Sequence, residues 1–151
     1  AVIVLDSSQN QLRSTDYTVS YAKGQKKVGN YTVTITFQGN YSGTVQKTFT
    51  ISPKATNITR LTSAKKKITV SWKKQTAQTS GYQIQYATSA KFKNAKKVTI
   101  SKNKISRKSI KKLKSKKKYY VRIRTYKTVK ANGKAQKIYS SWSKTRTVKT
   151  K

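Results

Sequence analysis

Cationic side chains are the most prominent chemical groups of this sequence, and they are densest between Lys111 and Tyr126. The stretch reads KKLKSKKKYYVRIRTY, with six lysines in eight residues and two arginines in the alternating run that follows. Closely spaced ammonium groups attract polyanions, although outward lysines also protect sheet edges from aggregation. The candidate polyanion-binding residues are Lys111, Lys112, Lys114, Lys116, Lys117, Lys118, Arg122 and Arg124.

Catalytic and metal-binding chemistry has few suitable residues in this chain. The 151 residues include no His, Cys, Met or Glu, and the two carboxylates are Asp6 and Asp16. Metal sites are built from His, Cys and carboxylates, and acid–base catalysis usually uses His or a carboxylate pair. An enzyme would need a rarer arrangement such as a Ser–Lys pair. We therefore predict a non-catalytic protein with no metal ligand and no cofactor.

The positive charge is distributed unequally along the chain. Residues 1–53 contain five cations and both aspartates, a net charge of +3. Residues 54–151 contain the other 31 cations and no acidic residue. A soluble domain needs only a modest net charge, and this excess raises self-repulsion. A bound polyanion is the expected source of compensation.

A domain boundary is expected near Pro53, the only proline of the chain. It follows the β-rich stretch TVQKTFTIS and precedes KATNITRLT, where the charge density changes. The predicted units are residues 1–53 and 54–151. No apolar run approaches the ~18 residues of a membrane span, and the opening AVIVL is too short for a signal peptide. We expect a monomeric part of a longer exported chain, without membrane insertion.

Both units are predicted to be all-β, because apolar and polar residues alternate over short runs separated by Gly, Asn and Ser. In the first unit, the expected strands are Tyr17–Ala22, Asn30–Gln38 and Thr44–Ser52. The apolar side chains of the second strand share one face, and apolar residues of the third lie opposite. Lys47 interrupts that third pattern, so we expect it at the turn side of the register or on a bulge.

The second unit contains seven predicted strands and no substantial helix. They are expected around Ile58–Leu61 and at Lys67–Trp72, Gly81–Tyr86, Lys96–Ser101, Arg107–Leu113, Tyr119–Tyr126 and Lys144–Thr150. Seven short strands separated by turn signals are typical of an antiparallel β-sandwich. The fold class is therefore two antiparallel β-sandwich modules, the first of them partial.

The first unit resembles a known bacterial repeat. The motifs DYTVSY, VGNYTVTI and GNYSGTVQKTFTI, between Asp16 and Lys54, are similar to the C-terminal part of immunoglobulin-like repeats in large surface and secreted proteins of Gram-positive bacteria. Such repeats have one or two further strands before the position of Ala1. The resemblance implies an immunoglobulin-like module that is truncated at its N-terminus.

The second unit resembles a fibronectin type III domain. The similarity is carried by Trp72 at a strand end, by GYQIQY with Tyr82, and by Leu113 followed six residues later by Tyr119. It implies structural roles for these four residues and makes Tyr119 a corner tyrosine, with its hydroxyl bonded to the loop after Leu113. The family commonly has proline and glycine in this loop, where the present chain has KSKKK.

The alternation after Tyr119 places Arg122 and Arg124 on the outer face, together with Tyr120 and Tyr126. The later motif YSSWS resembles the Trp-Ser-x-Trp-Ser element of cytokine-receptor fibronectin domains, in which aromatic rings and guanidiniums alternate. The resemblance implies that Trp142 and Tyr139 interleave with the two arginines. We interpret this stack as structural, although faces of Arg and aromatic residues also bind bases and sugars.

These features predict an extracellular accessory region, secreted or cell-wall associated. The first unit would be a spacer, and the second would attach to anionic polymers: teichoic acid or another cell-wall polyanion, sulfated glycan, or nucleic acid bound non-specifically. Lysine disfavours base-specific readout, which depends on Arg, Asn and Gln. Three alternatives remain open: a carbohydrate-binding accessory of a glycan-degrading enzyme, a host-glycan adhesin, and a purely structural spacer.

Overall fold

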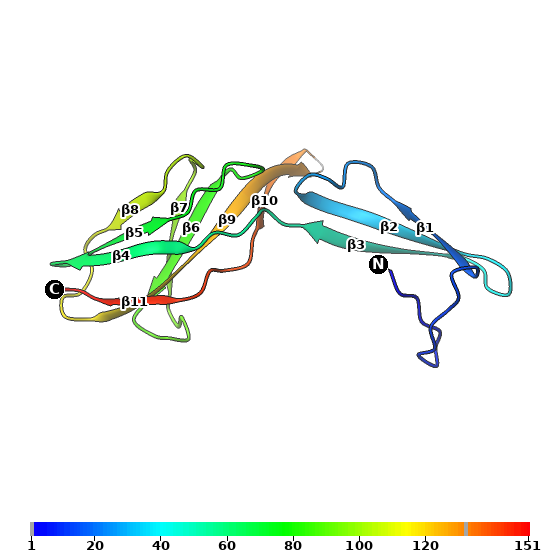
Figure 1. Cartoon of the computed structure of the whole chain (residues 1–151), viewed down its shortest axis with the longest axis horizontal. Coiled ribbons are helices and arrows are strands. Elements are labelled where there is room, and N and C mark those ends of the chain that lie inside the picture. Colours follow the sequence, from blue (N-terminus) through cyan, green and yellow to red (C-terminus); the bar gives the residue numbers. More distant parts are fainter. Residues whose placement is uncertain (1, 132) are drawn as a thin grey trace. The chain divides into compact units, whose positions relative to one another are not determined.

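The computed structural model describes residues 2–131 and 133–151, and the chain divides into two compact units, Ala1–Ile51 and Ser52–Lys151 (Figure 1). Every regular element in the described ranges is a β-strand, and every strand pairing is antiparallel. The predicted all-β class is therefore confirmed.

Unit 1 has one three-stranded sheet in the order β1-β2-β3. Its strands are β1 (Tyr17–Tyr21), β2 (Gly29–Phe37) and β3 (Thr44–Ile51). The β2–β3 register is continuous and pairs Lys47 with Val33. The bulge expected as one alternative for Lys47 is therefore wrong, because the ladder accommodates this side chain without a register shift. Lys47 lies in the half of the ladder nearer the turn, as the other alternative expected.

The core of unit 1 is small. Its buried cluster comprises Val4, Leu12 and Ile35, and the N–H of Leu12 donates a 2.9 Å hydrogen bond to the carbonyl of Val4. Ile3 remains 66% exposed and Val45 remains 38% exposed. An irregular N-terminal segment thus partly covers one sheet.

Unit 2 is a sandwich of two sheets, visible as the two layers of this unit in Figure 1. One sheet has the order β4-β5-β8, and the other has the order β10-β9-β6-β7 with β11 also paired to β9. The strands are β4 (Ile58–Ala64), β5 (Lys67–Trp72), β6 (Gly81–Ala87), β7 (Lys96–Ile100), β8 (Arg107–Ile110), β9 (Lys118–Ala131), β10 (Lys134–Tyr139) and β11 (Arg146–Lys149).

One predicted strand of unit 2 needs correction, and one observed strand was not predicted. The strand expected over Arg107–Leu113 ends at Ile110, because Lys112 has a left-handed backbone (φ 58°) and the Leu113 N–H bonds to the Lys66 carbonyl. Strand β10 was not predicted. It pairs with the distal half of β9, which extends that strand to Ala131.

The interruption between β10 and β11 has a clear hydrogen-bonding cause. The hydroxyl of Ser140 accepts a 3.1 Å hydrogen bond from the N–H of Thr125, and the hydroxyl of Ser143 accepts one of 3.1 Å from the N–H of Ile123. These hydroxyls replace the carbonyls of a regular neighbouring strand, so β9 remains satisfied while the chain beside it leaves the sheet.

The core of unit 2 follows from strict alternation. Ile68, Val70 and Trp72 of β5 face Tyr82 and Ile84 of β6, and all five are buried. The Trp72 and Tyr82 rings lie 5.2 Å apart. Burial of large apolar side chains on both sheets stabilises the sandwich without any disulfide.

Candidate functional site

Five lysines of the predicted site lie in the loop between β8 and β9, and the sixth, Lys118, is the first residue of β9. All six side chains are exposed: Lys111, Lys112, Lys114, Lys116, Lys117 and Lys118. The loop backbone is held firmly. The Thr150 hydroxyl donates a 2.6 Å hydrogen bond to the Lys114 carbonyl and accepts one of 3.1 Å from the Lys117 N–H. A fixed backbone therefore presents a cluster of solvated ammonium groups.

Buried residues anchor this loop at both ends. Leu113 belongs to the core cluster, and so does Tyr119 at the start of β9. The Tyr119 hydroxyl accepts a 3.0 Å hydrogen bond from the Lys114 N–H, a contact of the kind that the family resemblance implied. The loop is thus ordered even though KSKKK replaces the usual proline and glycine.

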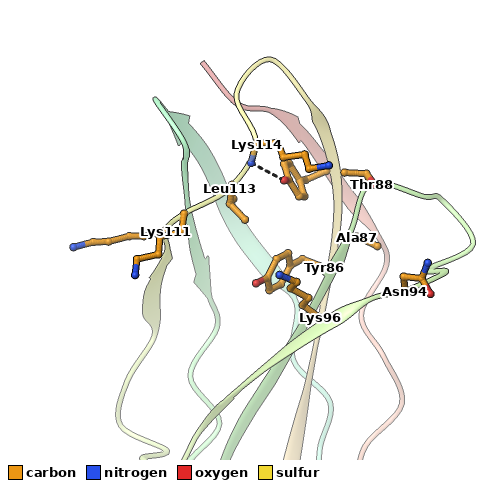
Figure 2. A pocket seen from close by; sticks show the side chains of 10 residues that line it. Tyr86, Ala87, Thr88, Asn94, Lys96, Lys111, Leu113 and Lys114 are labelled. Atoms are coloured by element: carbon orange, nitrogen blue, oxygen red, sulfur yellow. Dashed lines mark hydrogen bonds between the residues drawn. The ribbon is translucent and has the colours of Figure 1, made fainter.

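A hollow of about 330 Å³ opens beside the lysine loop, and we call it the lysine hollow. Figure 2 shows Leu113 pointing toward Tyr86 and Lys111 extending away from both. Burial raises the pKa of the Tyr86 hydroxyl, so it is a neutral donor at physiological pH. The lining comprises Tyr86, Ala87, Thr88, Asn94, Lys96, Lys111, Lys112, Leu113, Lys114 and Tyr119.

The lysine hollow includes residues that sequence reasoning did not assign to a site. Strands β6 and β7 form a hairpin that pairs Tyr86 with Lys96, and the loop between them contributes Thr88 and Asn94. The two-strand pattern GYQIQY and KKVTIS was the available signal for this pairing. It does not say which loop of the other sheet lies nearby.

Arg122 and Arg124 form a separate structure on the outer face of β9. The Arg122 guanidinium carbon lies 4.1 Å from the Phe92 ring centre and 4.7 Å from that of Trp142. The corresponding Arg124 distances are 4.3 Å to Trp142 and 3.6 Å to Tyr139. The rings and guanidiniums therefore alternate in the order Phe92, Arg122, Trp142, Arg124, Tyr139, which we call the Arg–aromatic stack.

Glutamines on β6 occupy the edges of the two guanidiniums. Arg122 Nε donates a 2.8 Å hydrogen bond to Gln85 Oε1, and Arg124 donates two, of 3.0 and 2.7 Å, to Gln83 Oε1. Desolvation by burial lowers the pKa of Arg124. Rings thus contact the faces of these guanidiniums, and glutamine oxygens bind their edges. No member of the stack lines the lysine hollow.

Tyr126 differs from its expected outward exposure. It lies on the outer face of β9 but is only 2% exposed, because the Tyr139 ring and the Lys137 amine cover it. Gly81 is its partner on β6, and a Cβ at that glycine would lie 2.9 Å from the Tyr126 hydroxyl and 2.0 Å from the Ile100 carbonyl oxygen. The close packing therefore depends on glycine.

Two kinds of site are not found in the described ranges. Residues 2–131 and 133–151 contain no group of three or more His, Cys, Asp or Glu that could hold a metal ion. Over the same part of the chain, no helix has the length and apolar character needed to cross a membrane.

The chain consists of two β-modules in sequence, and the second is a two-sheet sandwich with many exposed cations. The family model of the fibronectin type III domain matches residues 52–141, and the chain belongs to this family. The family model of the bacterial Ig-like domain (group 3) matches residues 1–52. The predicted family resemblances and their order along the chain are confirmed.

A solved structure shares the fold. The crystal structure of the chicken CNTN1 FN1-FN3 domains is 20% identical in sequence and has a TM-score of 0.52. The match covers 82% of this chain and 42% of that one, so the chain spans less than half of its length. None of the curated proteins compared with the chain matches it. Modules of the two matched families are typically non-catalytic and commonly occur in extracellular proteins.

Proposed function

We propose that the chain is a non-catalytic accessory region of an exported bacterial protein, with unit 1 as a spacer and unit 2 as an attachment module. Unit 2 would bind anionic cell-wall polymers such as teichoic acid by electrostatics. The observation that carries this proposal is the exposed lysine loop in a unit that has 31 cations and no Asp or Glu. No carboxylate side chain within unit 2 can neutralise these lysines.

Attachment of this kind depends on charge density rather than on a sequence or sugar code. A lysine amine is a compact, strongly hydrated point charge on a flexible stem, so it imposes little geometry on its partner. Sulfated glycans and nucleic acids would therefore bind by the same mechanism. Binding would require neither membrane insertion nor oligomerisation, and it would hold the parent protein at the wall.

A carbohydrate-binding accessory is the second candidate, and the half-buried Trp142 on the Arg–aromatic stack favours it. Both faces of the neighbouring guanidiniums are already covered by rings, which leaves less surface for a sugar. A neutral-glycan site of this kind would depend on Trp142 and respond weakly to salt.

The test measures binding of the full chain to purified teichoic acid, DNA and a neutral polysaccharide at low and high salt. We expect polyanion affinity to fall steeply, by about 0.7–0.9 in log K per unit of log salt for each nucleic-acid phosphate neutralised. The neutral polysaccharide should not bind measurably. Polyanion binding that is absent, or that does not respond to salt, would contradict attachment by charge.

Matched variants locate the binding surface. Replacing Lys116, Lys117 and Lys118 together by Gln should lower the salt slope on DNA by about 2–3, because each lysine neutralises roughly one phosphate. Replacing Lys23, Lys26 and Lys27 of unit 1 by Gln removes the same charge from exposed positions and should lower the slope by less than about 1. Equal changes in both variants would show that unit 2 is not the attachment surface. Trp142→Ala should change the slope little.

A further inference from the structure

The lysine hollow lies at one end of unit 2, where three connections meet: the β4–β5 turn, the β6–β7 loop and the β8–β9 loop. A second hollow of about 540 Å³ shares Lys112, Leu113 and Lys114 with it and adds Lys66 and Ser115. The Leu113 N–H bonds to the Lys66 carbonyl at 3.0 Å, so the turn and the loop are joined directly. The two hollows therefore adjoin and form one concave surface, lined by cations of the β4–β5 turn and the β8–β9 loop and by Lys96 at the start of β7.

The backbone around this surface is unusual. Lys66, Asn94 and Lys112 have left-handed conformations, with φ of 52°, 52° and 58°. Asn adopts the left-handed conformation more readily than most residues. In Lys the Cβ makes this conformation strained, and Gly would adopt it with less strain. Phe92 is also left-handed (φ 55°), and its ring stacks on Arg122. Unit 2 contains no Asp or Glu side chain that could pair with Lys66 or Lys112.

Strained residues persist where the surrounding structure holds them, and they concentrate at functional sites. The two left-handed lysines, Lys66 and Lys112, both line the second hollow. Neutral hydrogen-bonding groups complete the lining: the amide of Asn94 and the hydroxyls of Thr88 and Tyr86. This combination of several cations and a few neutral donors suits a compact, multiply charged oxyanion that carries hydroxyl groups.

Size and charge narrow the ligand further. A volume of about 330 Å³ is at the lower end of small-molecule sites, enough for one anionic group and a short polyol. A phosphate monoester carries about −1.5 to −2 charge at pH 7 and three acceptor oxygens. A phosphodiester or a sulfate ester carries a single charge. We propose that the lysine hollow binds a terminal phosphate monoester of the anionic polymer, held by Lys96, Lys112 and Lys114, as a specific subsite within the attachment function proposed above.

The first experiment titrates the isotope-labelled full chain with glycerol phosphate and follows amide chemical shifts. We expect saturating shifts centred on Asn94, Lys112 and Lys114. The double substitution Lys112→Gln and Lys114→Gln should weaken binding by about fivefold or more, the effect of one ammonium at 4 Å from one charge in water. Lys73→Gln and Lys74→Gln, a matched exposed pair after β5, should change it by less than about twofold. Equal losses in the two pairs would overturn the subsite.

The pH dependence provides an independent readout. Unit 2 contains no Asp, Glu, His or Cys, the side chains that ordinarily titrate between pH 2 and 9. The charged residues that line the concave surface are lysines: Lys66, Lys96, Lys111, Lys112 and Lys114. Glycerol phosphate should therefore bind about fivefold more weakly at pH 5 than at pH 7.5, as its second ionisation near pH 6 is lost. Methyl sulfate, which stays a monoanion, should show a flat profile, and a flat glycerol phosphate profile would overturn the monoester assignment.

A third variant separates strain from charge. Lys112→Gly removes the ammonium group and also relieves the left-handed backbone, so Tm should rise by about 4 °C while glycerol phosphate affinity falls as in Lys112→Gln. A Tm rise without loss of affinity would contradict a binding role for Lys112. Teichoic acid binding that persists while the glycerol phosphate results fail would reject the subsite and retain the attachment function. If the unmodified chain binds neither teichoic acid nor glycerol phosphate, the proposed function itself is rejected.

Discussion

Units 1 and 2 differ both in net charge and in the size of their buried cores. Unit 1 has five cations, two carboxylates and three buried apolar residues in its described core cluster. Unit 2 has 31 cations, no carboxylate side chain and a described cluster of twelve buried residues. The difference indicates that a large one-sided charge is carried by the unit whose core burial can offset the self-repulsion.

The polar interactions differ in the same way. Unit 1 pairs Arg13 with Asp16 at 3.2 Å, an ordinary ion pair. Unit 2 has no acid for its arginines, so aromatic faces and amide oxygens take that place for Arg122 and Arg124. An acid-free domain can therefore order its guanidiniums without a salt bridge, and its solvent-exposed lysines remain available to external anions.

The largest effect should come from the core of unit 2. Trp72→Ala removes a side chain that is 3% exposed and should lower the free energy of unfolding of unit 2 by about 3–5 kcal/mol. The measurement is denaturant unfolding followed by Trp142 fluorescence, which reports on unit 2 because both tryptophans lie there. Lys74→Ala, a surface change, should stay within about 0.5 kcal/mol.

Ile35→Ala is the matching test in unit 1. It should lower the stability of that unit by about 2 kcal/mol, at the low end for an isoleucine truncation because its cluster is small. Amide signals of unit 1 would report this change while the tryptophan transition stays in place. A coincident shift of the tryptophan transition would contradict the independence of the two units. For the Trp72→Ala experiment, a denaturation midpoint equal to that of the unmodified chain would contradict the assignment of Trp72 to the core.

The Arg–aromatic stack should show a smaller, coupled effect. Trp142→Ala and Arg124→Ala should each lower the stability of unit 2, and the double variant should lose about 0.5–1 kcal/mol less than the sum, the size of one cation–π pair. Trp72 fluorescence provides the measurement. Trp142→Ala combined with Lys130→Ala is the control and should be additive. Strict additivity for the Arg124 pair would mean that the observed stacking contributes no free energy.

The smallest expected effect is the loss of stability of unit 1 at acidic pH. The side-chain hydrogen bond from Arg13 lowers the pKa of Asp16 from its ordinary 3.8, and the backbone N–H of Asn10 does the same for Asp6. A lowered native pKa contributes stability above pH 3.8, and that stability is lost as pH falls through the native value. Between pH 4 and 2, the denaturation midpoint of unit 1 should fall, while that of unit 2 should stay constant. Asp16→Asn should reduce the change in unit 1, and an acid-induced fall in unit 2 would contradict the comparison.

The strands of the core could be predicted because their pattern is local. Alternation alone placed Val70 and Trp72 inward and Arg122 outward, since successive side chains on a strand point to opposite faces. The end of β8 could not be predicted, because the left-handed turn at Lys112 depends on the bond between Leu113 and Lys66 from another hairpin. Strand β10 was missed although its pairing is local: it pairs Lys134 with Ala131 of β9, and the sequence between them is Asn-Gly, a strong hairpin signal.

The features of the candidate site also divide into those that the sequence determined and those that only the tertiary structure decided. The sequence by itself determined the all-β class, the acid-free charge of residues 54–151 and the eight cations of the dense stretch, because composition and alternation are properties of the chain. Only the tertiary structure decided that six of these cations are exposed, in the β8–β9 loop and at the first residue of β9, and that two are enclosed by Phe92, Trp142 and Tyr139. It also brought Lys96 and Asn94 to the lysine loop. Such neighbours come from different connections of the sandwich, and long-range packing rather than local periodicity sets the distance between them.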